Sequence, residues 1–323
     1  MKNILTAYQR VYIKNVLSKL MFWKRRRIFD LAFVITEDSK GWILEAICRE
    51  IATYFKGTYC FAHDLQNLPP AKAYYYAHYS YFPTCLQHNP HVLGSKHFPF
   101  HTHPKDIGLS QQEFNSVFNK ATKVVCMNST FAQQLVKEGL NKNKVTYIIC
   151  GADKEMFLPH TRGGGLVGFS TAFYERKDPD KILNIVTSMP NRNFLLIGKN
   201  WEKYSRFNEL LSQPNFKFVT ATYNEYPGYY RMMDVFVSPA VLEGGPIPLI
   251  ESMMSNVVPV ASKTGFAPDI IKDGENGYIF DVDASVEEIC LLIDKAFNCK
   301  ADIRSSVEHL TWENFSKNFQ RLL

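Results

Sequence analysis

The chain has 323 residues, of which 46% are hydrophobic and 21% charged, and its net charge is +6. This length exceeds one ordinary hydrophobic core and predicts two domains of about 130–160 residues. No apolar run approaches the roughly 18 residues that a membrane-spanning helix needs. The seven cysteines are scattered and form no C-x-x-C pair, which argues against a disulfide framework and against a zinc site built from cysteines.

Residues 1–27 carry eight basic residues and no acidic one, which leaves a net charge of −2 for the rest of the chain. Apolar and aromatic residues recur in this segment at helical spacing. A basic amphipathic helix predicts attachment to an anionic membrane surface, and packing on the protein body or on a partner helix is the alternative. Nucleic acid is not an expected partner, because the remainder of the chain is not basic.

From residue 28 onward, short apolar segments alternate with helical patterns. Strands are expected at 29–35, 58–62, 72–77, 97–101, 123–127 and 145–149, and helices at 41–55, 110–119 and 130–139. After Gly163-Gly164-Gly165 the alternation restarts, with strands at 166–169, 193–198, 216–220, 234–238 and 258–262. This α/β pattern predicts two Rossmann-like parallel-sheet domains, 28–160 and 161–300, that face a central cleft, followed by a helical segment at 301–323.

The segment around residues 234–251 carries the clearest chemistry. An apolar strand runs into a turn at Gly244-Gly245, and Pro246 stands where a helix takes its first residue. Unpaired backbone N–H groups at such a turn and helix start suit a phosphate. Glu243 precedes the turn, and Glu251 lies roughly 8 Å along the helix from Pro246. A phosphate site between two acids that can accept hydroxyl hydrogen bonds predicts a nucleotide-sugar site.

These residues resemble the retaining GT-B glycosyltransferases of the family-4 type, whose signature is two glutamates separated by seven residues, here Glu243-GGPIPLI-Glu251. Residues 145–159, 166–183, 193–198, 225–239 and 273–280 are similar to segments of that family in order and spacing. The resemblance is strong over about residues 120–315 and weaker before them. It also implies that the helix expected at 301–323 crosses back to the first domain, as a terminal helix often does in GT-B proteins.

The resemblance implies a GT-B enzyme of the hexosyltransferase type. Such an enzyme would move a sugar, with retention and without a metal or other cofactor, from a nucleoside-diphosphate sugar to a hydroxyl of a glycan or lipid-linked acceptor. Cationic side chains and helix N-termini would stabilise the leaving diphosphate. The implied setting is cell-surface polysaccharide or glycolipid synthesis. The scattered cysteines are typical of a cytosolic protein, and the basic segment 1–27 would place the enzyme at the inner membrane face.

The resemblance also assigns roles in the second domain. Lys177 matches the family's phosphate-binding lysine, and Arg176 beside it would assist. Glu251 would bind the ribose hydroxyls, and Glu243 would face the donor sugar or support the reacting centre. The wall near the diphosphate and sugar would be the backbone of four consecutive residues: Gly244, Gly245, Pro246 and Ile247.

Three further positions carry expectations from the resemblance. His101, in the segment FPFHTHP, matches a histidine that contacts the donor sugar. Gly41 is the single glycine of the loop after the first strand, where the family backbone approaches the diphosphate. Thr171 stands where the family has an arginine, so either Arg176 substitutes for it, or donor binding is weaker, or the site has decayed.

Other interpretations stay open at this point. Five histidines lie within residues 88–103 and admit a metal site, but their spacing matches no template. Asp178-Pro-Asp180 and Asp281-Val-Asp283 fit an Asp-x-Asp metal motif, although caps or turns explain them better. An epimerase or phosphorylase on the same fold, and a non-catalytic nucleotide-sugar-binding subunit, are the alternative functions.

Overall fold

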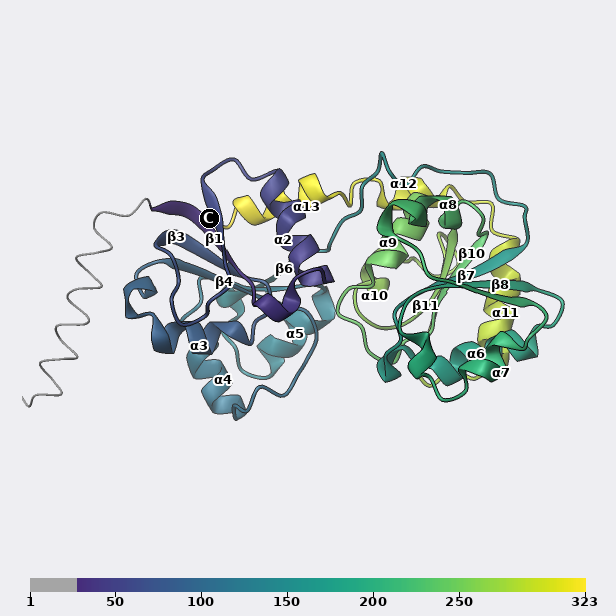
Figure 1. Cartoon of the computed structure of the whole chain (residues 1–323), viewed down its shortest axis with the longest axis horizontal. Helices are drawn as coiled ribbons and strands as arrows, with labels where there is room; N and C mark the ends of the chain where they lie inside the picture. Colours follow the sequence, from purple (N-terminus) through teal and green to yellow (C-terminus); the bar gives the residue numbers. More distant parts are fainter. Residues whose placement is uncertain (1–27) are drawn as a thin grey trace, which may run out of the picture.

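A computed structural model describes residues 28–323, and Figure 1 shows two α/β units joined side by side. The N-terminal helix and its membrane attachment were predicted for residues 1–27, which lie outside the described residues. No helix of the described part combines the length and the apolar character needed to cross a membrane.

The first unit is a six-stranded parallel sheet in the order β2-β1-β3-β4-β5-β6. Its strands are β1 (Phe29–Val34), β2 (Tyr59–Ala62), β3 (Ala71–Tyr76), β4 (Lys96–His101), β5 (Val124–Cys126) and β6 (Val145–Tyr147). Its helices are α2 (Ile43–Thr53), α3 (Tyr81–His88), α4 (Gln111–Phe118) and α5 (Ser129–Lys137). Central strands such as β1 and β3 are buried on both faces, as in a parallel sheet covered by helices.

The second unit repeats the architecture, with parallel strands in the order β12-β11-β10-β7-β8-β9. The strands are β7 (Leu166–Ser170), β8 (Asn193–Ile197), β9 (Phe216–Val219), β10 (Val235–Ser238), β11 (Val258–Ser262) and β12 (Tyr278–Phe280). The helices are α6 (Pro179–Ser188), α7 (Phe207–Leu211), α8 (Tyr226–Tyr230), α9 (Ile247–Met254), α10 (Ala267–Ile270), α11 (Val286–Phe297) and α12 (Ile303–Val307). The prediction of two Rossmann-like parallel sheets is confirmed.

Helix α13 (Trp312–Gln320) lies with the first unit, although it follows the second in sequence (Figure 1). The hydroxyl of Ser316 donates to the carbonyl of Ile51 in α2 at 2.9 Å. The ring of Phe319 packs edge-on against Tyr75 and Phe98, with centroid distances of 5.1 and 5.2 Å. The last helix is therefore part of the hydrophobic core of the first unit.

Two local expectations were wrong. Helix α9 begins at Ile247, so Pro246 caps it instead of being its first residue. The reason is a tight turn in which the Ile247 N–H bonds the Gly245 carbonyl at 2.9 Å. Strand β12 was not among the expected strands, because its three residues at a sheet edge are too few for a period to be visible.

Candidate functional site

The expected charged residues of the second domain gather at the carboxyl ends of β7 and β10. Arg176 and Lys177 lie on a short 3-10 helix after β7, and Glu243 lies on the loop after β10. The Glu243 carboxylate accepts from Arg176 Nη1 at 3.1 Å through Oε2 and is paired with Lys177 Nζ through Oε1. The side chains of Glu243 and Lys177 are only 6% and 17% exposed, so each charge depends on its partner.

A small cavity of about 20 Å³ adjoins this ion-pair cluster, and Thr171, Lys177 and Glu243 are among the residues that line it. It has room for about one water molecule. The Thr171 hydroxyl donates to the carbonyl of Ala172 at 2.9 Å, so it offers no free donor toward the cavity. Positive charge at this point therefore comes from Lys177 and Arg176.

The Gly244-Gly245 loop lies against the first domain. A Cβ atom on Gly244 would lie 2.0 Å from the carbonyl oxygen of Thr102, and one on Gly245 would lie 2.5 Å from Met127 Cε. The Gly244 carbonyl accepts from Asn128 Nδ2 at 2.7 Å. Within residues 28–323, the N–H groups of Gly244 and Gly245 have no hydrogen-bond acceptor. These donors lie between the two domains, where they can bind an anion.

Glu251 lies in α9 and is only 2% exposed. Its Oε1 accepts a hydrogen bond from the Tyr223 hydroxyl at 2.7 Å, and its Oε2 accepts one from the Tyr230 hydroxyl at 3.0 Å. Burial raises the pKa of Glu251 to about 7, although the two tyrosine hydrogen bonds oppose the rise. Both oxygens of the expected ribose-binding acid are thus already bound within the protein.

His101 ends β4, and its ring lies 4.5 Å from that of Tyr79. Burial lowers the pKa of His101 to about 3, so the imidazole is neutral near pH 7. Among the described residues its buried Nδ1 has no hydrogen-bond partner. His101 lines a cavity of about 180 Å³ between α4 and α5, which does not include Lys177 or Glu243. The structure does not bring this histidine into the cavity beside the ion-pair cluster.

His103, two residues further on, is the first-domain histidine coupled to the charged cluster. Burial lowers the pKa of His103, the positive charge of Arg176 lowers it further, and Glu243 opposes both effects. The ring of His103 lies 6.4 Å from that of His78. From the sequence, His103 is either an acceptor-side group or an exposed residue, and the signal for it is the second histidine of the segment HTH.

The loop after β1 reaches the second domain through Trp42. Gly41 has a φ of +73° with open space where a Cβ would stand. Its N–H, however, donates to Glu45 Oε2 at 2.7 Å. The neighbouring Trp42 ring lies beneath Lys199 Nζ, 4.6 Å from the ring centroid. Lys199 follows β8, so this cation–π contact joins the two domains at a position that the sequence did not indicate.

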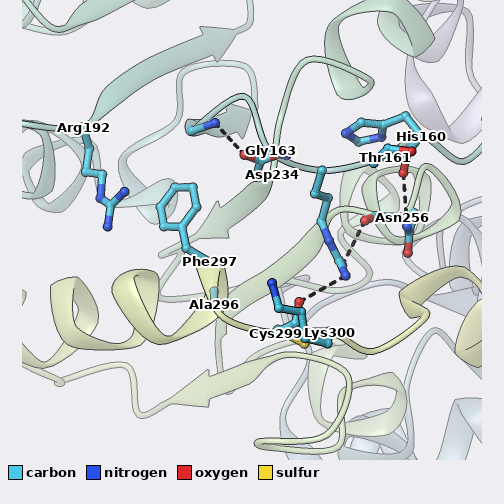
Figure 2. Close-up of a pocket in the computed structure, with 12 residues that line it drawn as sticks. His160, Thr161, Gly163, Arg192, Asp234, Asn256, Ala296, Phe297, Cys299 and Lys300 are labelled. Atoms are coloured by element: carbon cyan, nitrogen blue, oxygen red, sulfur yellow. Dashed lines mark hydrogen bonds between the residues drawn. The ribbon is translucent and has the colours of Figure 1, made fainter.

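A larger cavity of about 540 Å³ lies at the amino ends of β7 and β10, the opposite edge of the sheet (Figure 2). Its Asp234 carboxylate accepts from the N–H groups of Gly163 at 2.8 Å and Gly165 at 2.6 Å. Arg162 there donates to the Asn256 carbonyl at 3.2 Å. These polar groups hold the backbone as the chain enters the second domain.

The Asp-x-Asp segments and the clustered histidines form no metal site in the part of the chain that the structure describes. The Asp178 carboxylate accepts from the Lys181 N–H at 3.1 Å and caps α6, as expected. Within the described range, no group of three or more His, Cys, Asp and Glu side chains is arranged to hold a metal ion.

Comparison with solved structures gives the class of the fold, which is GT-B. A crystal structure of Anabaena Alr3699/HepE in complex with UDP-glucose has a TM-score of 0.72, with 13% identity over 91% of this chain and 98% of that chain. A glycosyltransferase from Rickettsia africae has a TM-score of 0.73, with 13% identity over 92% and 98%. The lipopolysaccharide outer core galactosyltransferase WaaB, in its apo form, has a TM-score of 0.69, with 12% identity over 90% and 98%.

Comparison with protein sequences finds similarity to one family and to one curated relative. Residues 153–310 match the family described as glycosyl transferases group 1. The uncharacterized glycosyltransferase MJ1178 of Methanocaldococcus jannaschii is 25% identical over 171 residues, 51% of this chain and 47% of the relative. The matched region thus spans about half the length of that curated relative. The fold is therefore GT-B, and residues 153–310 are similar to the glycosyl transferases of group 1.

Proposed function

We propose that this protein is a retaining, metal-independent glycosyltransferase. It moves a hexose from a nucleoside-diphosphate sugar to a hydroxyl of a glycan or lipid-linked acceptor. The observation that carries the proposal is the ion-pair cluster of Lys177 and Arg176 on the buried Glu243, beside the unpaired N–H groups of Gly244 and Gly245. Cations and free backbone donors at the carboxyl edge of a parallel sheet suit a diphosphate.

In this proposal, Lys177 and Arg176 leave their ion pairs with Glu243 and bind the donor diphosphate instead. The Glu243 carboxylate then faces the sugar. The bond between the anomeric carbon and the β-phosphate oxygen breaks, and the acceptor oxygen bonds the same face of that carbon. The acceptor proton passes to the departing phosphate oxygen, and the nucleoside diphosphate leaves. His101, which is neutral near pH 7, would bond a donor hydroxyl once the cleft closes, and Glu251 would hold the ribose.

UDP-sugars are the first donors to test, because the Anabaena neighbour has a crystal structure in complex with UDP-glucose. Attachment of residues 1–27 to an anionic membrane surface, in polysaccharide or glycolipid synthesis, completes the proposal. It rests on the charge pattern of that segment alone.

A second candidate is a nucleotide-sugar-binding subunit without turnover. Two observations favour it: Thr171 supplies no charge at the phosphate site, and Lys177 and Glu251 are already engaged by protein groups. Such a subunit would bind a nucleotide but release none of it from a sugar donor when acceptor glycans are added.

The test is calorimetric titration with UDP, GDP, ADP and dTDP, with and without EDTA, followed by a transfer assay with the sugar of the preferred nucleotide. We expect one nucleotide to bind irrespective of EDTA, and binding to be lost in Lys177→Ala. Lys181→Ala is the matched control, because Lys181 is paired with Asp178 at the start of α6. Absence of binding for all four nucleotides, or binding that survives Lys177→Ala, would refute the assignment.

A further inference from the structure

The two hydrogen bonds to Glu251 come from tyrosines in very different environments. Tyr230 is fully buried, and its ring packs against Phe157 and Phe236 with centroid distances of 5.7 and 6.1 Å. Tyr223 has an exposed fraction of 48%, although its hydroxyl reaches Glu251 Oε1 at 2.7 Å. Of the two partners of the carboxylate, only Tyr223 can leave without opening the hydrophobic core.

The segment that carries Tyr223 is a short turn stabilised by its own capping hydrogen bonds. Tyr223 begins the 3-10 helix Tyr223–Glu225, which follows β9 and precedes α8. Thr222 and Glu225 cap this helix by bonding each other. The backbone N–H and the hydroxyl of Thr222 each donate to Glu225 Oε2, both at 2.7 Å. Both capping side chains are exposed, so the turn keeps its own hydrogen bonds when it shifts. The Tyr223 ring contacts Phe157 at a centroid distance of 6.0 Å.

The hydrogen bond from Tyr223 to Glu251 has the same chemistry as the bond expected from a ribose hydroxyl to Glu251. A phenol hydroxyl donates one O–H to one carboxylate oxygen, and a ribose hydroxyl offers the same donor. A nucleotide can therefore replace the Tyr223 bond one for one, while Tyr230 keeps Oε2. A buried carboxylate oxygen left without any donor would be costly, and the Tyr223 hydroxyl supplies such a donor to Oε1.

We propose that Tyr223 is a gate on the nucleotide site, with its hydroxyl occupying the position of a ribose hydroxyl on Glu251 until a nucleotide displaces it. The inference rests on the proposed function, because it takes Glu251 as the ribose-binding acid. The displaced ring stays beside the nucleoside, where its exposed face is available to the base. Tyr223 thereby lowers the affinity for every nucleotide by the same factor, since the open form alone is competent to bind.

The test compares Tyr223→Phe with the wild type by calorimetry and stopped-flow binding of UDP, GDP and ADP. Loss of one competing hydrogen bond is expected to tighten binding roughly 3- to 10-fold, through faster association. Tyr226→Phe is the matched control, because Tyr226 begins α8 directly after the 3-10 helix and its hydroxyl has no hydrogen bond within the described residues. Unchanged or weaker binding by Tyr223→Phe would overturn the gate.

A second measurement needs no variant. Acetylation of tyrosines by N-acetylimidazole, followed by peptide mapping, reports the reactivity of the Tyr223 hydroxyl with and without saturating UDP. The gate predicts that UDP increases acetylation of Tyr223, whereas a tyrosine that stays on Glu251 would be protected or unaffected. Protection by UDP would overturn the proposal even if Tyr223→Phe folds poorly.

The outcomes separate this inference from the proposed function. Nucleotide binding that is lost in Lys177→Ala but is no tighter in Tyr223→Phe refutes the gate and leaves the donor site standing. Binding by Tyr223→Phe when the wild type binds too weakly to measure supports both. Absence of binding by the wild type and by Tyr223→Phe, for all three nucleotides, refutes the donor site and the gate with it.

Discussion

Replacement of Glu251 by glutamine should change how the stability of this protein depends on pH. Burial raises the pKa of Glu251 to about 7 from an ordinary value of 4.5. The folded protein therefore keeps the proton over a pH range in which the unfolded chain has lost it. The stabilisation is fully present below pH 4.5 and is lost as the pH rises to about 7. The side chain introduced by Glu251→Gln would not titrate, and its amide can still bond both tyrosine hydroxyls.

The size of the effect follows from the shift. A difference of about 2.5 pKa units corresponds to about 3 kcal/mol, at roughly 1.4 kcal/mol per unit. For a domain of about 150 residues, this is a change of roughly 6–12 °C in the melting temperature. The wild type should lose about this amount relative to Glu251→Gln as the pH rises from about 4.5 to about 7.5.

The assay is urea unfolding of both proteins at several pH values between about 4.5 and 8. Only the difference between the two proteins is informative, because burial lowers the pKa of His78, His97 and His101 to about 4, 4 and 3. Those histidines make stability rise with pH over part of the same range. Parallel pH profiles for wild type and Glu251→Gln would show that the carboxyl is not desolvated, and would refute the reasoning.

Three other changes test other parts of the structure. Gly244→Ala places a Cβ 2.0 Å from the Thr102 carbonyl oxygen, so nucleotide binding should fall at least tenfold and the radius of gyration should rise in small-angle scattering; an unchanged radius would contradict this. Lys177→Met should cost about 3 kcal/mol of unfolding free energy in urea, because it removes one of the two cations paired with the buried Glu243 carboxylate. Adding Glu243→Gln should restore stability but not nucleotide binding, and a double variant as unstable as the single one would argue against the ion pair. His97→Gln should reduce the acid sensitivity between pH 6.5 and pH 4 by up to about 3 kcal/mol, since His97 is neutral when folded; an acid-unfolding midpoint equal to that of the wild type would count against it.

Local patterns predicted the sheets well, because every strand except β12 is marked by a short apolar run in the sequence. They also placed Glu243 and Lys177 near the same sheet edge, through their positions after β10 and β7. They did not predict that the two side chains pair, since 66 residues separate them. The two tyrosines that bond Glu251 lie in the connection between β9 and β10. The four tyrosines within residues 223–230 were the feature of the sequence that could have indicated these contacts.

The return of the C-terminal helix α13 to the first domain has a consequence for synthesis on the ribosome. The rings of Tyr75 and Phe98 are covered by Phe319 of α13, so the first domain cannot close its core until translation has passed the end of that helix. The second domain emerges in the meantime and folds beside a neighbour whose apolar face is still open. Vectorial folding, in which the N-terminal domain finishes first, is therefore not open to this chain, because its first domain completes its core only after the second domain has been synthesised.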